Sequence, residues 1–434
     1  MTDPMNHQHD QHDQHDQQQL SGTTRRGVLS YVGAGGLGLL GGAAAMRLAD
    51  GARDTGPGSG AAGATGTTGA TAATGPTVST TVSPFGVHQP GVTAPTPVAN
   101  RVLALDLLPG VDREGLARLM RLWTGSIAAA MEGRAAPGDT ARDLAQGNLD
   151  LSVTVGWGRS LFDKVGLTDA RPPALAAVPA FKHDKLQKRW SGGDLMLLIA
   201  ASDDTSVTHV LRRLLLDAKP FATLRWEQDG SWRRLDANHQ PHTGRNLFGQ
   251  VDGTGNLATD HELFDSVVWT KTPDWFAGGT TIVVRRISMD LDLWDTVTRG
   301  DQELSVGRDL DVGAPLTGEK ETDKPDFTAI NEFDQPVIPV DSHLALSHPD
   351  NNGGARILRR GMNYTTYDAA SGTRDAGLIF VSFQADIEAQ FTTIQRRLDK
   401  SDRLNEWTTA IGSAEFAVLP GFAQGGWLGD TLLA

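Results

Sequence analysis

The chain has 434 residues, 39% of them hydrophobic, which is enough for two or three domains with substantial cores. Its formal net charge of −13 argues against nucleic acid and anionic membrane surfaces as partners. The sequence contains no cysteine, which excludes disulfides, thiolate metal ligands, thiol nucleophiles and covalent c-type haem attachment. Any metal would therefore depend on His, Asp or Glu side chains, or on a cofactor.

The N-terminus predicts an export signal. A low-complexity leader rich in Gln, Asp and His is followed by Arg25-Arg26 and a short, glycine-rich apolar run that ends near Ala45. A twin arginine before a weakly hydrophobic stretch is typical of a twin-arginine signal peptide, which we assign to residues 1–45; an uncleaved anchor is the alternative. Residues 46–82 are rich in Gly, Ala and Thr and are predicted to be a disordered linker.

The remaining chain shows a similar pattern of strands and helices in each half. Apolar runs and helical spacing predict the first-half strands 101–108, 149–155 and 194–201, with helices after Asp112 and over 205–216. The same signals predict the second-half strands 280–290 and 377–383, with helices around 293–297, 301–307 and 387–398. This order indicates two similar α+β units with antiparallel sheets, joined near residues 240–250. We place the units at 83–247 and 248–434.

A glycine-framed acid is the first candidate for chemistry. The stretch from Gly249 to Asn256 reads G-Q-V-D-G-T-G-N, and Asp252 is its only ionisable residue. Glycine permits positive φ and close backbone approach, so the loop is suited to holding a carboxylate over a flat ligand. A polar surface turn is the alternative, because Asp-Gly is a common turn dipeptide. A calcium-binding turn is a further alternative, although the expected alternating acids are missing.

A second polar segment lies between Asp341 and Tyr364 and contains two histidines and three arginines. A neutral imidazole at His343 could ligate iron or zinc, although most histidines in folded domains are not ligands. Arg359 and Arg360 could equally be solvated or paired with surface carboxylates.

Together these stretches resemble the dye-decolourising peroxidase family, in its exported bacterial branch that also includes deferrochelatase-type iron-uptake proteins. The resemblance extends from about Phe85 to the C-terminus. It rests on F-G-V-H-Q-P-G-V, the G-x-x-D-G signature at Gly249, Asp252 and Gly253, G-G-T-x-x-V-V-R-R-I, G-A-P-L, H-L-A-L…R-I-L-R-R-G and G-L-I-F-V-S-F. It implies an α+β fold of two ferredoxin-like domains with antiparallel sheets, of the dimeric α+β barrel type, sandwiching one haem b per chain.

The resemblance also assigns roles to residues. His343 matches the proximal ligand of the haem iron, Asp252 the distal acid and Arg359 the distal arginine, with Arg360 as the alternative. Asp402 matches the carboxylate that bonds the proximal imidazole, and His348 is a second histidine that competes for the ligand role. The remaining predicted haem contacts are Gly253, Thr254, Gly255, Pro349, Asp350, Leu378 and Phe380.

The chemistry implied is peroxide cleavage by general acid–base catalysis. Asp252 would move a proton between the two oxygens of hydrogen peroxide, and the arginine would favour the ionised carboxylate and activity in acid, leading to a ferryl intermediate. We therefore expect a secreted, extracellular or cell-envelope peroxidase that oxidises dyes, phenols or other aromatic reductants. The alternative is a deferrochelatase-like protein that releases iron from haem. The implied partners are the twin-arginine translocase and unidentified iron-uptake or copper-oxidase proteins, without nucleic acid.

Overall fold

The computed structural model describes residues 82–146, 150–233, 242–369 and 372–434. The predicted signal peptide, and the linker up to residue 81, lie outside these residues. The strands are β1 Ala99–Leu107, β2 Ser152–Gly158, β3 Leu195–Ala201, β4 Ala222–Ser231, β5 Thr280–Met289, β6 Leu358–Arg359, β7 Met362–Asp368, β8 Thr373–Gln384 and β9 Thr408–Val418. The α-helices are α1 Arg113–Met131, α2 Arg159–Lys164, α3 Asp204–Ala218, α4 Phe264–Val268, α5 Leu291–Trp294, α6 Arg299–Val306, α7 His343–Ser347, α8 Thr393–Ser401 and α9 Asp430–Leu433.

The described strands form one antiparallel sheet that closes on itself. Their order is β5-β9-β2-β3-β1-β4-β7-β8-β6, and β5 also pairs with β8. Within this ring the first half has the order β2-β3-β1-β4 and the second half β9-β5-β8-β7, which is the strand order of a ferredoxin-like unit in both cases. The halves meet where β2 pairs with β9 and where β4 pairs with β7. The predicted α+β fold with antiparallel sheets in a barrel-like arrangement is confirmed.

The central strands are buried on both faces, which is why their sequences read as continuous apolar runs. In β3, Leu195, Leu197 and Ile199 point into one core, which packs beneath the helices of the first half. Met196 and Leu198 point to the other face, where they join a core shared by strands of both halves. The interior of the closed sheet is therefore filled with side chains.

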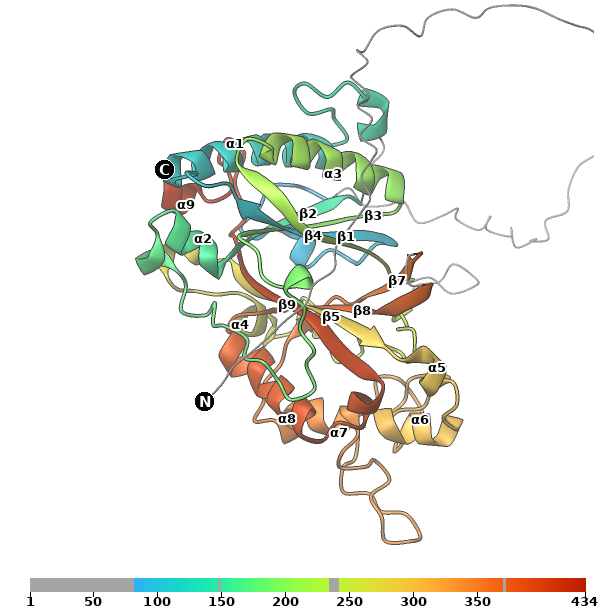
Figure 1. Cartoon of the computed structure of the whole chain (residues 1–434). Helices are drawn as coiled ribbons and strands as arrows, with labels where there is room; N and C mark the ends of the chain where they lie inside the picture. Colours follow the sequence, from blue (N-terminus) through green and yellow to red (C-terminus); the bar gives the residue numbers. More distant parts are fainter. Residues whose placement is uncertain (1–81, 147–149, 234–241, 370–371) are drawn as a thin grey trace, which may run out of the picture. The chain divides into compact units, whose positions relative to one another are not determined.

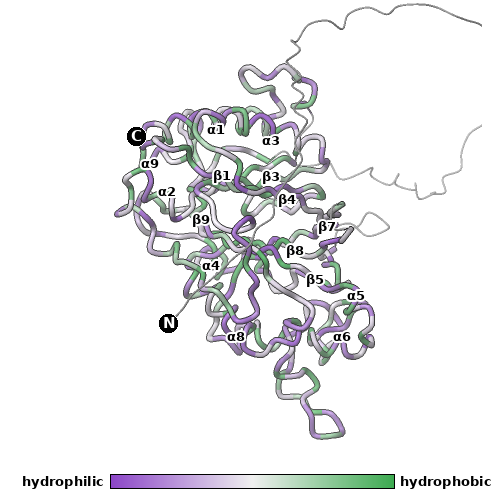
Figure 2. The backbone as a smooth tube through the Cα atoms, in the orientation of Figure 1, coloured by the Kyte–Doolittle hydropathy of each residue, from purple (hydrophilic) through white to green (hydrophobic). Residues whose placement is uncertain are grey.

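Helices cover the outer faces of the two halves. α1 and α3 lie together over the strands of the first half, whereas α7 and α8 lie over those of the second half (Figure 1). In Figure 2 the tubes of α1 and α3 carry both hydrophilic and hydrophobic stretches, as expected of helices with one buried face. Among the described residues, none of the helices combines the length and the apolar character needed to span a bilayer.

Several element boundaries differ from the predictions. β2 begins at Ser152, and residue 149, where the predicted strand begins, lies outside the described residues. The helix predicted at 293–297 is α5, which begins earlier because Asp290 caps it. The helix predicted over 387–398 begins as a π-helix, Ile387–Thr392, before α8. Strands β4, β7 and β9 were not predicted from the sequence. The exact boundary between residues 247 and 248 stays a prediction.

Candidate functional site

A cavity of about 520 Å³ lies in the second half of the fold. Its walls come from the 246–257 loop, the 306–325 segment, the 343–350 region that includes α7, and the 355–359 segment. Phe380 on β8, together with Phe391, Ile394 and Leu398, adds an apolar side. Segments far apart in sequence therefore line one cavity.

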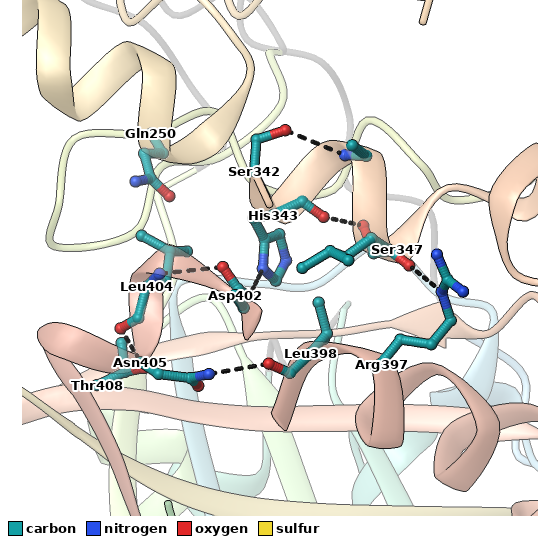
Figure 3. Close-up of polar contacts among 12 residues, drawn as sticks. Gln250, Ser342, His343, Ser347, Arg397, Leu398, Asp402, Leu404, Asn405 and Thr408 are labelled. Carbon is teal, nitrogen blue, oxygen red and sulfur yellow. Dashed lines mark hydrogen bonds and ion pairs between the residues drawn. The ribbon is translucent and has the colours of Figure 1, made fainter. Parts of the chain in front are cut away.

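His343 is the first residue of α7, and its ring is held by Asp402 just after α8 (Figure 3). Ser342 caps α7 by accepting a hydrogen bond from the Ala345 amide. The Nδ1 atom of His343 lies 2.6 Å from Oδ2 of Asp402, whose other oxygen accepts a hydrogen bond from the Leu404 amide. Since the carboxylate binds Nδ1, the Nε2 atom is the nitrogen left to ligate a metal.

The surroundings of His343 determine the pKa of its imidazole. Its side chain is 31% exposed and lines the cavity, whereas that of Asp402 is only 4% exposed. Burial favours the neutral imidazole, but the charge and the hydrogen bond of Asp402 outweigh this and raise the pKa of His343 above its ordinary value. A carboxylate behind an imidazole makes the free nitrogen a stronger electron donor.

Asp252 and Arg359 form an ion pair in the same cavity. Nη1 of Arg359 lies 3.1 Å from Oδ1 of Asp252, and both side chains are largely buried. Gly249 and Gly253 adopt positive φ on either side of the acid, which is why the loop requires glycine there. Oδ2 of Asp252 has one long contact, 3.5 Å, with Nδ2 of Asn246. This oxygen is therefore the one available for proton exchange.

Asn256, at the end of the same loop, fixes the backbone of Arg359. Its Nδ2 donates to the Arg359 carbonyl at 2.8 Å, and its Oδ1 accepts from the Arg359 amide at 2.8 Å. This reciprocal pair ties the acid-bearing loop to β6. Sequence reasoning did not single out Asn256.

Adjacent arginines, Arg359 at the end of β6 and Arg360 just after it, have different surroundings. Arg360 is buried, and its Nη1 donates to the carbonyls of Gly91, Val92 and Ala94 in the first half of the chain. It is not among the residues that line the cavity, whereas Arg359 is. The structure therefore brings Arg359, and not Arg360, to Asp252.

Most other predicted contact residues also line the cavity. Thr254, Gly255, His348, Pro349, Asp350 and Phe380 belong to its wall. His348 forms no contact with Asp402; its Nδ1 accepts from the Asp350 amide, and burial lowers its pKa. Gly253 and Leu378 are not among the lining residues. Leu378 instead packs against an apolar cluster around Phe248 and Trp294.

Charged cavity residues that sequence reasoning missed include Arg308 and Glu321. Arg308 follows α6, and Glu321 accepts hydrogen bonds from the hydroxyls of Thr243 and Thr254. Both belong to the irregular segment between α6 and α7, where neither periodicity nor motif spacing marks a site. G-A-P-L, which begins at Gly313, was the only signal in this region.

The residues of the cavity fit a haem. One imidazole nitrogen is presented with a carboxylate behind it, as in a histidine-ligated haem protein. Phe380, Ile357 and Leu344 provide apolar surface for a flat ring, and the Asp252–Arg359 pair supplies polar groups. The volume lies within the roughly 300–1,000 Å³ range of small-molecule and cofactor sites.

Comparison with known proteins agrees with this geometry. The family model "Dyp-type peroxidase, N-terminal" matches residues 89–232, and "Dyp-type peroxidase, C-terminal" matches residues 243–423. The dye-decolorizing peroxidase of Thermobifida fusca (strain YX) is 37% identical over 428 residues, covering 95% of this chain and 97% of the relative. A deferrochelatase of Yersinia pseudotuberculosis serotype I (strain IP32953) is 34% identical over 368 residues, covering 80% of this chain and 84% of the relative.

Solved structures give the same result. Ferric DtpA from Streptomyces lividans superimposes with a TM-score of 0.79 at 38% identity, covering 82% of this chain and 99% of that chain. A DyP-type peroxidase from Cellulomonas bogoriensis gives a TM-score of 0.78 at 39% identity, with coverages of 82% and 98%. The chain therefore belongs to the Dyp-type peroxidase family and is a haem-dependent peroxidase.

Proposed function

We propose that the protein is a secreted peroxidase that holds one haem b per chain and uses hydrogen peroxide to oxidise dyes, phenols or other aromatic reductants. One observation carries the proposal. The His343–Asp402 pair and the Asp252–Arg359 pair, which are far apart in sequence, line the same cavity. The first pair has the composition of a haem-iron ligand with its supporting acid, and the second that of a proton-transfer site.

His343 would hold the cofactor through Nε2, the ring nitrogen that Asp402 leaves free. Bound there, the haem would supply the electrons that cleave the oxygen–oxygen bond of peroxide. Asp402 keeps the imidazole in the tautomer whose Nε2 is free. Thr254, Gly255, His348, Pro349, Asp350 and Phe380 are the other lining residues assigned to haem contact.

Asp252 would act as general base and then as general acid. Its Oδ1 is occupied by Arg359, so Oδ2 takes the proton from one peroxide oxygen and returns it to the other, which leaves as water. Arg359 keeps the carboxylate in place and donates to the oxygen on which negative charge develops. Asn256 holds the backbone of Arg359 and so keeps its guanidinium beside the carboxylate of Asp252.

The test uses the haem-loaded protein and its Asp252→Asn variant. Both should show a strong Soret band with one equivalent of haem, because Asp252 is not the ligand. After rapid mixing with hydrogen peroxide, the variant should react about 10²–10⁴-fold more slowly, the range expected for losing a positioned proton-transfer group. A variant that reacts at the parental rate would contradict the role of Asp252. A parental protein without a Soret band would contradict the haem proposal itself.

A second candidate function is favoured by the relatives named deferrochelatase, at 33–34% identity over 80% of this chain. In this alternative the same cavity binds haem but releases its iron and leaves the porphyrin intact. Metal-free porphyrin fluoresces, whereas haem does not, so fluorescence during turnover distinguishes the two. Dye or phenol oxidation without porphyrin fluorescence supports the peroxidase, and the reverse supports iron release.

Export is the remaining part of the proposal. Arg25-Arg26 and the glycine-rich run to Ala45 support passage through the twin-arginine translocase to the outside of the cell or the cell envelope. Replacing both arginines by lysine should retain the full-length chain inside the cell. Secretion that is unchanged by this replacement would contradict the assignment.

A further inference from the structure

Asn246 contacts the oxygen of Asp252 on which the proposed proton transfer depends. Its Nδ2 lies 3.5 Å from Oδ2 of Asp252, and within the described part of the chain this is the one side-chain hydrogen bond of that oxygen. Asn246 lines the same cavity as Asp252 and begins the turn that carries Gly249. Neither the acid–base step nor the ligation of iron accounts for this asparagine.

Backbone amides determine which end of the Asn246 side chain faces the acid. Oδ1 accepts hydrogen bonds from the amides of Phe248 at 3.0 Å and Gln250 at 3.3 Å. An oxygen is required at this position, because a backbone amide can only donate. Nδ2 is therefore the atom that faces Asp252, and the carboxylate receives an N–H from it.

Gln250 takes the other N–H of the same amide. Its Oε1 accepts from Nδ2 of Asn246 at 3.3 Å, and Gln250 is only 6% exposed. A primary amide has two N–H donors and two acceptor positions, so all four positions of Asn246 are occupied. Rotation of the amide would break all four contacts. The N–H is thus held toward Asp252 before any ligand enters the cavity.

The contact acts on the charge of the acid. A hydrogen bond donated to a carboxylate stabilises its ionised form. Oδ1 of Asp252 already accepts from Arg359, so Asn246 supplies the donor to the second oxygen. Because the contact is long, it is weak enough to leave Oδ2 open to a proton. The other charged or titratable side chains that surround this pair are Arg245, Arg308, Glu321, His343 and Arg359.

We infer that Asn246 is a positioning residue of the peroxide reaction, whose N–H keeps Oδ2 of Asp252 ionised and in place to accept the proton. This inference rests on the proposed function, because Asn246 acts only through Asp252. The strength of this hydrogen bond then sets the pH below which the reaction with peroxide slows.

Two substitutions change the donor and keep an acceptor for the turn. Asn246→Ser retains an oxygen for the turn amides but is too short to reach Asp252. Asn246→Asp replaces the N–H by a second carboxylate beside the acid. Haem-loaded proteins are mixed rapidly with hydrogen peroxide over a range of pH. The pH of half-maximal rate should rise by about 0.5–1 unit in Asn246→Ser and by at least about one unit in Asn246→Asp.

A second readout does not require haem. In the haem-free protein, infrared difference spectra follow the carboxyl band that the Asp252→Asn variant lacks. The pH at which this band appears should rise in Asn246→Ser by the same amount as the kinetic midpoint. An unchanged infrared midpoint would contradict the inference. A parental protein without a Soret band after addition of haem would instead contradict the proposed function, which is a separate outcome.

Asn331 provides the matched control. Its Oδ1 accepts from the amides of Phe333 at 2.9 Å and Gln335 at 3.1 Å, so it closes a turn with the same spacing as Asn246. Asn331 is exposed and is not among the residues that line the cavity. Asn331→Ser and Asn331→Asp should leave both midpoints unchanged.

A purely structural role for Asn246 would have a different signature. Both Asn246 variants would then lower the plateau rate or the melting temperature, and the kinetic and infrared midpoints would stay at their parental values. That result would overturn the inference. A midpoint that rises further in Asn246→Asp than in Asn246→Ser, with no change in the Asn331 variants, supports it.

Discussion

The two halves of the closed sheet have the same strand order, but they carry different coverings. In the first half, α1 and α3 bury a large apolar core against the sheet, in which Trp123 is fully buried and its Nε1 donates to the Leu214 carbonyl. In the second half, the chain between β5 and β7 forms short helices and irregular segments in place of one long helix. In the first half, packed side chains fill the space between helices and sheet. The second half retains a cavity whose polar walls are held by hydrogen bonds.

One sheet topology can therefore provide either a packed core or a binding site. A long amphipathic helix fills its share of the surface with interdigitating side chains. The short helix α7 and the 306–325 segment cannot fill it, and they place His343, Arg308 and Glu321 around a space instead. Substitutions in the first half should therefore alter stability, and those around the cavity should alter chemistry.

The largest effect is expected for His343→Ala. Haem affinity should fall by more than the roughly 10- to 100-fold that loss of an outer partner such as Asp402 costs, because the ligand itself is removed. The apoprotein should lose no more than about 1–3 kcal/mol, the cost of an unpaired buried acceptor. Soret titration and thermal melting measure the two quantities. His348→Ala is the control, and a greater loss of affinity in that variant would move the ligand assignment to His348.

Trp123→Ala is the corresponding change in the first half. Its free energy of unfolding should be lower by about 3–5 kcal/mol, because a large aromatic side chain is removed from a packed core. The neighbouring Leu122 on the same helix is 47% exposed, so Leu122→Ala should cost less than about 1 kcal/mol. Denaturant unfolding measures both. Loss of haem affinity per folded molecule in Trp123→Ala would show that the two halves are less independent than proposed.

Arg359 and Arg360 allow the same contrast between adjacent residues. Arg359→Leu should slow the reaction with peroxide by about 10²–10³-fold, the usual effect of removing one donor to developing charge. Arg360→Leu should leave that rate nearly unchanged but lower the free energy of unfolding by about 1–3 kcal/mol, because buried carbonyls at Gly91 and Ala94 lose their donor. Stopped-flow mixing and denaturant unfolding measure the two effects. An exchange of these outcomes would return the catalytic role to Arg360.

The smallest effect is expected at Glu415 on β9, the strand where the halves meet. Burial raises the pKa of this carboxyl to about 7, and the positive charge of Arg159 only partly opposes the effect. A raised folded-state pKa means that Glu415 favours the folded state when protonated. That contribution is complete below the ordinary value of 4.5 and is lost as the pH rises through about 7.

Glu415→Gln should therefore stabilise the protein at pH 8 by on the order of 1–3 kcal/mol, and have little effect at pH 4.5. Thermal melting of both proteins across this range measures the difference. A difference that does not grow with pH would show that Glu415 is not held in its neutral form. If the stability difference between the two proteins instead grew below pH 4.5, the predicted direction of the pH dependence would be wrong.

The strands whose positions followed from the sequence are those buried on both faces. β1, β3, β5 and β8 contain the continuous apolar runs that are typical of such strands. β4 carries charged side chains on an exposed face, β7 is rich in Asn, Thr and Tyr, and the central residues of β9 are small, so none of them shows such a run. The pattern of α7 is too short to indicate a helix, and its cap at Ser342 is evident only in the structure.

The sequence alone determined the α+β class and the repeated architecture, because apolar periodicity is a local property, and it predicted the export signal. The main candidates Asp252, His343, Arg359 and Asp402 came from the resemblance of its motifs to a known family. The tertiary structure decided which candidates meet. It separated Arg359 from Arg360, which depends on the direction in which consecutive side chains of an extended segment point. It also brought Arg308 and Asn256 to the cavity, since these contacts join residues distant in sequence and leave no local signal.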